Sequence, residues 1–305
     1  MASMTTRFTA VGLGEILWDL LPGGKQLGGA PSNFAYMANL LGDEGVVASR
    51  VGEDALGREV VETLTRLGLV TTHLQFDGSH PTGTVDVRVD SNGQPEFTIT
   101  ECVAWDYLEW RPDWADLAKR ADVVCFGSLA QRSDTSRATI LQFLRSLSPR
   151  CLRVFDVNLR QVFYSAQVIR DSLQCSDIMK VNHNELPTVA QILGVEFQRE
   201  AETARTMLQA GSLKLICITR GDSGSVLVDR SGCSEHNGFR VMVADTVGAG
   251  DAFTACMAHC YLRGEGLGAI NEAANRFAAW VASRPGATPS LEGRTLNEVL
   301  SAIGE

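Results

Sequence analysis

The sequence predicts an α/β fold in which helices flank a doubly wound, mostly parallel sheet, and three observations support this prediction. In the second half of the chain, apolar runs of strand length alternate with segments of amphipathic helical periodicity, which is typical of parallel sheets. Polar residues follow several of these runs, at the strand ends where such sheets bind ligands. Earlier in the chain, a half-polar hairpin indicates a second, smaller sheet.

The first third of the chain is expected to contain two buried strands, each followed by a helix. In chain order these are Phe8–Leu13, Phe34–Leu41, Val46–Val51 and a helix between Gly52 and Gly68. Residues Gly83–Val89 then alternate between apolar and polar side chains, and a return strand covers Phe97–Thr100. The intervening Ser91-Asn92-Gly93 is a hairpin-turn signal, so these two strands form the half-polar hairpin.

Strands and helices alternate through the rest of the chain. The expected strands are Val123–Phe126, Leu152–Asp156, Ile178–Val181 and Leu215–Thr219, and the expected helices are Ser136–Leu147, Ala166–Gln174 and Thr203–Ala210. Three strand ends bear polar residues: Asp156 to Arg160, Lys180 to Asn182, and Thr219 to Gly221. Because the carboxyl ends of parallel strands meet at one edge of a sheet, we expect these groups to face a common ligand site.

Composition argues against several classes of protein. The chain has 305 residues and a net charge of −9, so it has no general attraction for nucleic acid. No apolar run approaches the ~20 residues that span a bilayer, and the N-terminus lacks an apolar signal core. The eight cysteines include no C-x-x-C pair, and Cys256 and Cys260 are expected to pack in the core instead of binding a metal. We therefore expect a cytoplasmic protein without nucleic-acid or membrane partners.

The stretch Asp245–Phe253, with the sequence DTVGAGDAF, has the most specific chemistry in the chain. The small residues Gly248 to Gly250 precede a predicted helix, Ala252–Arg263, and a helix N-terminus offers unpaired N–H groups to a phosphate. Asp251 opens that helix and is placed to take a proton from an attacking hydroxyl. Each piece alone is also consistent with a simple glycine turn and a capped helix. The complete string favours phosphoryl transfer.

The string at residues 245–253 resembles the C-terminal signature of the PfkB, or ribokinase-like, family of carbohydrate kinases. Residues 28–42, GGAPSNFAYMANLLG, resemble the N-terminal motif of the same family. The resemblance covers nearly the whole chain, and GEILWDLLPGGKQLGGAPSN and KVNHNEL are most similar to bacterial fructokinases. It implies a single ribokinase-like domain over residues 1–305, with a lid sheet formed by inserted segments at about 15–28 and 82–104. Family members often pair through this lid, so a homodimer is expected.

The resemblance implies that a small sugar binds in the N-terminal half, under the lid. Gly28 and Gly29 would let the backbone approach the sugar, and Asn33 would bind its hydroxyl groups. Asp19 would accept hydrogen bonds from a vicinal diol, since a carboxylate has two accepting oxygens. Trp105 is expected either to line this site or to be an exposed loop residue.

In the C-terminal half, the stretch from Thr219 to Ser225 resembles part of the ATP site of the family. By this resemblance, Thr219 and Gly221 would lie along the phosphates and ribose, and Asn275 would lie near the adenine. Lys180, at a strand end, is expected in the same nucleotide site. Arg160 resembles an arginine that lies near the substrate or the transferring phosphate, where a guanidinium suits spread phosphoryl charge; the alternative is a surface ion pair.

Two metal sites are also implied. Asn182 and Glu185 have the N-x-x-E form that the family uses for divalent metal, and they are expected to organise water around Mg²⁺. A simple helix cap is the alternative. A monovalent-cation site, with K⁺ as the candidate ion, would be formed mainly by backbone carbonyls. The matching positions are Asp245, Val247, Val281, Arg284, Gly286 and Ser290.

The expected activity is an ATP- and Mg²⁺-dependent sugar kinase with fructose as its substrate. Asp251 would take the hydroxyl proton while the N–H groups of Ala249, Gly250 and Asp251 hold the developing charge. Ribose, 2-keto-3-deoxygluconate, tagatose and nucleosides remain alternative substrates within the family. A dehydrogenase is disfavoured because Leu17 stands where a dinucleotide-binding loop would have its third glycine. A non-catalytic sugar-binding regulator would not need the intact Gly-Ala-Gly-Asp string.

Overall fold

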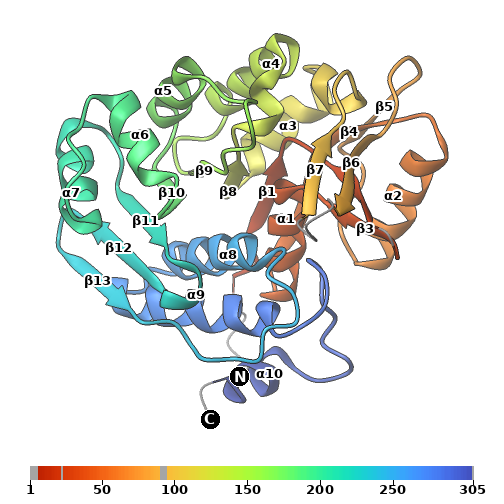
Figure 1. Cartoon of the computed structure of the whole chain (residues 1–305). Coiled ribbons are helices and arrows are strands. Elements are labelled where there is room, and N and C mark those ends of the chain that lie inside the picture. Colours follow the sequence, from red (N-terminus) through yellow and green to blue (C-terminus); the bar gives the residue numbers. More distant parts are fainter. Residues whose placement is uncertain (1–5, 22, 90–94, 304–305) are drawn as a thin grey trace.

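The computed structural model describes residues 6–21, 23–89 and 95–303. In this part of the chain, nine strands form the main sheet, in the order β13-β12-β11-β10-β9-β8-β1-β4-β5 (Figure 1). Their bounds are β1 Thr9–Leu13, β4 Glu44–Gly52, β5 Leu74–Asp77, β8 Val123–Phe126, β9 Leu152–Asp156, β10 Ile178–Asn182, β11 Leu215–Thr219, β12 Ser225–Asp229 and β13 Cys233–His236. The seven neighbouring strands β11-β10-β9-β8-β1-β4-β5 pair in parallel, and β12 and β13 extend one edge in antiparallel fashion. The predicted doubly wound, mostly parallel sheet is confirmed.

Helices cover both faces of this sheet. They are α1 Ala30–Leu40, α2 Ala55–Arg66, α3 Pro112–Arg120, α4 Asp134–Arg145, α5 Ala166–Gln174, α6 Leu186–Leu193, α7 Glu200–Ala210, α8 Ala249–Leu262, α9 Leu267–Ala282 and α10 Leu296–Ser301. Successive side chains of a strand point to opposite faces, so each buried strand contributes to two apolar cores. On β9, Phe155 joins the core under α3 to α7, and Val154 joins the core under α1, α2, α8, α9 and α10.

Four helices begin earlier than predicted: α4 at Asp134, α7 at Glu200, and the two motif helices α1 and α8. Helix α1 starts at Ala30 instead of Phe34, because Pro31 is tolerated in the first turn of a helix. Helix α8 starts at Ala249 instead of Ala252, so Asp251 lies within its first turn. The two helices pack against each other on the same face of the sheet. This contact brings the N-terminal and C-terminal motifs together, although they are far apart in the sequence.

A second sheet has the order β3-β2-β6-β7, with the bounds β2 Leu17–Leu21, β3 Gly24–Gly28, β6 Gly83–Val89 and β7 Pro95–Ile99. Strands β2 and β6 pair in parallel, and the other two pairs are antiparallel. All four strands fall within the segments predicted for the lid, about 15–28 and 82–104. The predicted turn at Ser91-Asn92-Gly93 lies outside the described residues.

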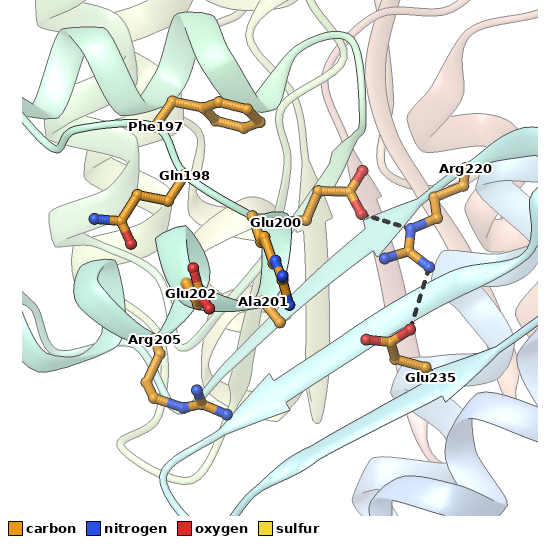
Figure 2. Close-up of a pocket in the computed structure, with 9 residues that line it drawn as sticks. Phe197, Gln198, Glu200, Ala201, Glu202, Arg205, Arg220 and Glu235 are labelled. Carbon is orange, nitrogen blue, oxygen red and sulfur yellow. Dashed lines mark hydrogen bonds and ion pairs between the residues drawn. The ribbon is translucent and has the colours of Figure 1, made fainter.

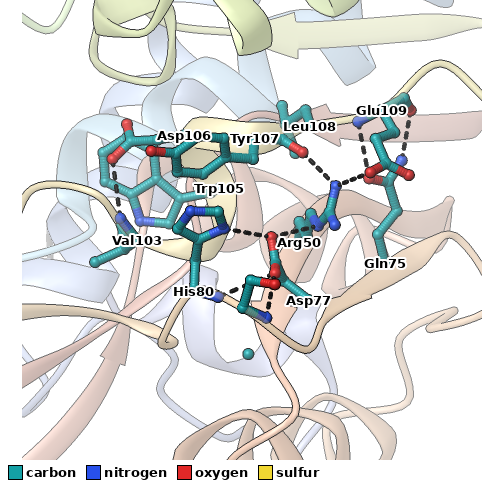
Figure 3. A network of polar contacts seen from close by, with 12 residues as sticks. Arg50, Gln75, Asp77, His80, Val103, Trp105, Asp106, Tyr107, Leu108 and Glu109 are labelled. Carbon is teal, nitrogen blue, oxygen red and sulfur yellow. Dashed lines mark hydrogen bonds and ion pairs between the residues drawn. The ribbon is translucent and has the colours of Figure 1, made fainter.

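A polar network anchors the chain where it passes from the main sheet to the second sheet (Figure 3). The Arg50 Nε atom, on β4, lies 3.0 Å from the carboxylate of Asp77 at the end of β5. The same carboxylate lies 3.0 Å from the ring nitrogen of His80, which stacks on Tyr107 with 3.6 Å between ring centroids. Both Arg50 and Asp77 are buried, so the linker that leads into β6 is held firmly against the main domain.

None of the helices in residues 6–21, 23–89 and 95–303 combines the length and the apolarity that a membrane span requires.

Candidate active site

The first turn of α8 has the features of an anion site. Gly248 caps the helix with a φ of 79°, and a Cβ there would lie 2.8 Å from the Cα of Ala287. Only glycine satisfies both conditions. Among the described residues, the N–H groups of Gly250 and Asp251 have no acceptor, whereas the N–H of Ala249 donates to the carbonyl of Thr246 at 3.3 Å. Two donors at the positive end of α8 therefore remain for a phosphate, and the third is already engaged.

Asp251 belongs to this turn and also contacts a residue of the predicted sugar site. Its Oδ2 atom accepts a hydrogen bond of 2.8 Å from the side-chain amide of Asn33, which comes from the first turn of α1. Burial, followed by the negative charge of Asp156, raises the pKa of Asp251 to about 6. The Asn33 hydrogen bond and the charges of Lys180 and Arg160 act in the opposite direction. A carboxylate with a pKa near the operating pH can serve as a general base.

A buried ion pair lies beneath the same turn. Lys180, in the middle of β10, donates to Asp156 Oδ1 at 3.1 Å, and Thr254 on α8 donates to Asp156 Oδ2 at 2.9 Å. A Cβ on Gly250 would lie 3.2 Å from the Lys180 ammonium, so this cation sits directly beside the anion turn. Burial alone would lower the pKa of Lys180, but the carboxylates of Asp156, Asp251 and Glu185 raise it, so it stays charged. Asp156 was predicted as a strand-end residue that faces a ligand site, and the structure places it beside the first turns of α8.

The sugar-side residues converge on the start of α1. Asp19 lies on β2, and a Cβ on Gly28 would be only 2.4 Å from its Oδ2 atom, so the carboxylate lies over the Gly28 backbone. Gly29 has a φ of 104° and packs on the backbone of Glu15. Burial raises the pKa of Asp19 to about 6, although the charge of Arg160 opposes this rise. The structure therefore brings Asp19, Gly28, Gly29 and Asn33 to one place.

Glu15 is a site residue that the sequence reasoning missed. Its side chain is 2% exposed, and its Oε2 atom has no hydrogen-bond partner among the described residues. Burial raises its pKa to about 7, while the nearby backbone N–H groups and the charge of Arg160 act against the rise. The signal was available, because Glu15, like Asp19, is a carboxylate within the apolar run between Phe8 and Leu21.

Arg160 reaches this site electrostatically. It lies on the loop after β9, where Asn158 and Gln161 have positive φ values of 41° and 48°. Its side chain forms no ion pair with a described residue, which argues against the surface ion-pair alternative. Arg160 is exposed, and its positive charge lowers the pKa values of both Asp19 and Asp251.

Trp105 does not occupy either of its two expected positions. It lies on a 3₁₀ turn, Ala104–Tyr107, with a side chain that is 0% exposed. The guanidinium of Arg132 covers its ring at 4.0 Å, and Arg132 is itself paired with Asp106 at 2.8 Å. The indole thus belongs to the apolar core between the sheets, so it neither lines a sugar pocket nor projects from an exposed loop.

Three of the predicted nucleotide residues lie on β11, on the turn that follows it and on α9. Thr219 ends β11, and Gly221 follows with a φ of 62° and open space around its Cα. Asn275, on α9, is buried, and its amide donates to Ser225 Oγ at 2.7 Å and to Asn271. The amide nitrogen of Asn275 is therefore engaged within the protein and is not free to contact an adenine ring.

Arg220, which stands between Thr219 and Gly221, is paired with two acidic side chains (Figure 2). Its Nε atom lies 2.5 Å from Glu200 and its NH1 atom lies 3.7 Å from Glu235. These groups line a pocket of about 460 Å³ beside α7, which also includes Phe197 and Arg205. None of the predicted site residues lies in this pocket, so it is separate from the site at α8.

Asn182 and Glu185 cap each other. The Asn182 N–H donates to Glu185 Oε2 at 3.0 Å, and the Glu185 N–H donates to Asn182 Oδ1 at 2.9 Å. Glu185 Oε1 accepts from the N–H of Leu159 at 2.8 Å, and burial raises the pKa of this carboxyl. These bonds close the turn just before α6, whose N-cap residue Glu185 makes no side-chain cap hydrogen bond. Among the described residues, no three His, Cys, Asp or Glu side chains are grouped to hold a metal ion by themselves.

The monovalent-cation positions are partly assembled by Asp245. Its two carboxylate oxygens accept the N–H groups of Val247 at 3.0 Å and of Gly286 at 3.1 Å. The hydroxyl of Tyr36, on α1, donates to the carbonyl of Pro289 at 2.8 Å and holds the same loop. The remaining positions lie at the end of α9 and along the following loop: Val281, Arg284 and Ser290. This loop is thus fixed against the segment that leads into α8.

Several known proteins are similar to this chain in sequence and in fold. The chain is 30% identical to a fructokinase of Salmonella typhimurium over 256 residues, covering 80% of this chain and 81% of that protein. It is 28% identical to fructokinase-1 of Zea mays, covering 97% and 98% of the two chains. Its fold is similar to that of the uncharacterized sugar kinase PH1459 from Pyrococcus horikoshii in complex with ATP, with a TM-score of 0.77, 28% identity, and coverage of 96% and 99%.

The family model that matches the chain is the pfkB family carbohydrate kinase, over residues 23–294. The match includes the glycines before α1, the strand ends of the main sheet, and the anion turn with Asp251. The chain therefore belongs to the pfkB family of carbohydrate kinases and is a phosphotransferase that acts on a sugar.

Proposed function

We propose that this chain transfers the γ-phosphate of ATP to a primary hydroxyl of fructose. The observation that carries the proposal is the 2.8 Å hydrogen bond between Asn33 and Asp251. It joins a residue of the expected sugar site to a carboxylate at the anion turn of α8. A sugar hydroxyl held by Asn33 would lie beside the base and beside the phosphate site, which is the geometry that in-line transfer requires.

In the proposed reaction, Asp251 Oδ1 takes the hydroxyl proton as the sugar oxygen bonds to the γ-phosphorus and the bond to ADP breaks. Asn33 holds Oδ2, which orients the carboxylate. The free N–H groups of Gly250 and Asp251, together with the Lys180 ammonium, stabilise the charge on the transferring group. Arg160 adds a second positive charge close to both Asp19 and Asp251.

Mg²⁺ is proposed as the metal, held chiefly by the nucleotide phosphates and by water. Asn182 and Glu185 fit an indirect role, because the Glu185 oxygens already accept from Asn182 and Leu159, and Asn182 Oδ1 accepts from Asn184 and Glu185. Mg²⁺ keeps several waters when it is bound to proteins, so such an arrangement is sufficient. It would supply charge neutralisation on the phosphates. K⁺ at the loop that follows α9 is proposed on the contacts of Asp245.

The same proposal includes a lid role for the second sheet and a homodimer formed through it. The sheet has two edge strands, β3 and β7, and Phe97 on β7 is 52% exposed. An apolar side chain on an unpaired edge is suited to pairing with a second copy. Sedimentation equilibrium should give twice the chain mass, and a monomer at micromolar concentration would contradict this part of the proposal.

The test is ADP release with ATP and Mg²⁺ against fructose, ribose, 2-keto-3-deoxygluconate, tagatose, adenosine and no sugar. We expect the largest kcat/KM with fructose. In Asp251→Asn, turnover should fall by about 10²–10⁴-fold, the usual contribution of a general base, while sugar still binds. Turnover close to wild type in this variant would show that Asp251 is not the base.

Asp134→Asn is a matched control, because Asp134 is an exposed aspartate in the first turn of another helix, α4. Its turnover should equal that of the wild type. If another sugar of the panel is preferred, fructose is wrong but the kinase assignment stands. If no sugar stimulates ADP release although sugar or ATP binds, the non-catalytic regulator is favoured instead.

A further inference from the structure

Gln26 lies on the second sheet, directly opposite Asp19. Strands β2 and β3 are antiparallel, and their register pairs Asp19 with Gln26 and Leu17 with Gly28. Directly opposed residues of such a pair project from the same face of the sheet. Since the Asp19 carboxylate lies over Gly28 on that face, Gln26 is on the sugar side of the sheet.

The neighbours of Gln26 confirm this orientation, because they occupy the other face. The Lys25 ammonium lies 2.5 Å from Glu59 and 5.0 Å from the ring centroid of Trp18. Leu27 is buried in the same core as Trp18. Side chains alternate along a strand, so Gln26 points away from these residues and toward the site.

The amide of Gln26 also reaches the loop that follows α9. A Cβ on Gly286 would lie 3.6 Å from Gln26 Oε1 and 3.9 Å from its Nε2. Gly286 donates to Asp245, and the adjacent Ala287 packs on Gly248 at the start of α8. Gln26 therefore lies where the second sheet meets the segment that forms the anion turn.

This half-buried amide has hydrogen-bonding capacity that the protein does not use. Neither its oxygen nor its nitrogen forms a hydrogen bond with another described residue, although both lie close to Gly286. An amide offers two donors and an acceptor, whereas the nearby Asp19 carboxylate only accepts. The pair together suits neighbouring hydroxyl groups on one neutral sugar.

We propose that Gln26 is a specificity-determining residue that hydrogen-bonds a hydroxyl of the acceptor sugar next to the hydroxyl held by Asp19. The inference rests on the proposed sugar-kinase function and on the lid role of the second sheet. By contacting the sugar and the Gly286 backbone region together, Gln26 would hold the second sheet over the bound substrate. Sugar binding would then depend on this amide, and ATP binding would not.

The test is steady-state kinetics of Gln26→Leu, which keeps the size of the side chain and removes its hydrogen bonds. We expect the KM for the preferred sugar of the panel to rise about tenfold, with the KM for ATP and kcat within about threefold of wild type. Lys25→Met, on the other face of the same strand, should leave both KM values unchanged. Gln26→Glu keeps an acceptor and should fall between the wild type and Gln26→Leu.

A sugar KM within twofold of wild type in Gln26→Leu would overturn the proposal. Equal rises in the KM values for sugar and ATP would also overturn it, because they would assign Gln26 only to ordering the loop at Gly286. Melting temperatures of all variants show whether a change in KM reflects unfolding. Failure of the sugar-kinase function itself is recognised separately, since the wild-type protein would then release no ADP with any sugar.

Discussion

Helices α1 and α8 begin in similar ways but present different chemistry. Each follows a glycine with positive φ, 104° at Gly29 and 79° at Gly248, and the two helices pack side by side. At α1 the first turn is used internally: the Ser32 hydroxyl donates to the carbonyls of Gly28 and Gly29, and the Glu15 carboxyl lies close to the N–H of Ala30. At α8 two N–H groups of the first turn have no acceptor among the described residues.

The comparison shows that a helix start after a positive-φ glycine can serve either substrate of a two-substrate reaction. The α8 turn keeps its donors and its neighbouring Lys180 for an anion, which the macrodipole also favours. The α1 turn is rigid and carries Asn33, whose amide is the only described side chain that hydrogen-bonds Asp251. One turn is thus suited to bind the phosphate, and the other is suited to orient the base and the sugar.

The largest expected effect comes from disrupting the α8 side with Lys180→Met. The side chains of Lys180 and Asp156 are 9% and 5% exposed, so the variant leaves a buried carboxylate without its partner. Removing one member of a buried pair typically costs about 3–5 kcal/mol of unfolding free energy. Turnover should also fall by about a hundredfold, because the cation beside the anion turn is lost. Thermal unfolding and ADP release well below the melting temperature measure the two effects separately.

Lys214→Met is the control for that variant. Lys214 pairs with Asp177 at 2.9 Å, but its side chain is 56% exposed. Exposed pairs contribute about 0–1 kcal/mol, so stability and turnover should both stay close to wild type. Equal losses in the two variants would mean that the buried position of Lys180 has no special importance.

A smaller effect is expected from Gly28→Ala, which disturbs the α1 side. The new Cβ would lie 2.4 Å from Asp19 Oδ2, so the carboxylate must move. We expect the KM for sugar to rise about tenfold while the KM for ATP is unchanged, since a displaced carboxylate loses about one hydrogen bond to a hydroxyl. Gly268→Ala, on α9 where a Cβ meets nothing within 4 Å, is the matched control. A sugar KM that does not change in Gly28→Ala would place the substrate elsewhere.

The smallest effect is a shift in pH dependence that links the two sides. Asp251 and Asp19 both have a pKa of about 6 instead of the ordinary 3.8, and both must be ionised to act as base and acceptor. As the pH falls through about 6, kcat/KM should therefore decline, with a limiting slope of up to about two. An unchanged kcat/KM down to pH 5 would contradict this assignment.

Two variants of Arg160 sharpen the pH measurement. The charge of Arg160 lowers the pKa values of Asp19 and Asp251, so its removal in Arg160→Met should move the midpoint of the acid limb to higher pH. Arg160→Lys retains the charge and should leave the midpoint close to that of the wild type. The midpoint is informative even if both variants turn over more slowly.

The sequence by itself determined the order of the elements and most of the motif residues. Alternation of apolar strands with amphipathic helices predicted β8, β9 and β11 with their observed bounds, because buried parallel strands need continuous apolar runs. Gly248 was identified because small residues let a phosphate approach a helix N-terminus, and Gly28 was identified through the family resemblance. The structure shows the contacts that a Cβ would make at both positions. Such local constraints are visible in a sequence because neighbouring residues impose them.

The tertiary structure alone decided which of these residues meet and which are already engaged. Trp105 could have been exposed, but the fold encloses it under Arg132; Asn275 could have been free, but its amide is bonded to Ser225. Pairing Lys180 with Asp156, and placing Gln26 beside Gly286, depends on contacts between distant segments of the chain. Burial, charge and hydrogen-bond satisfaction are set by all the packed elements together, so no local pattern in the sequence contains them.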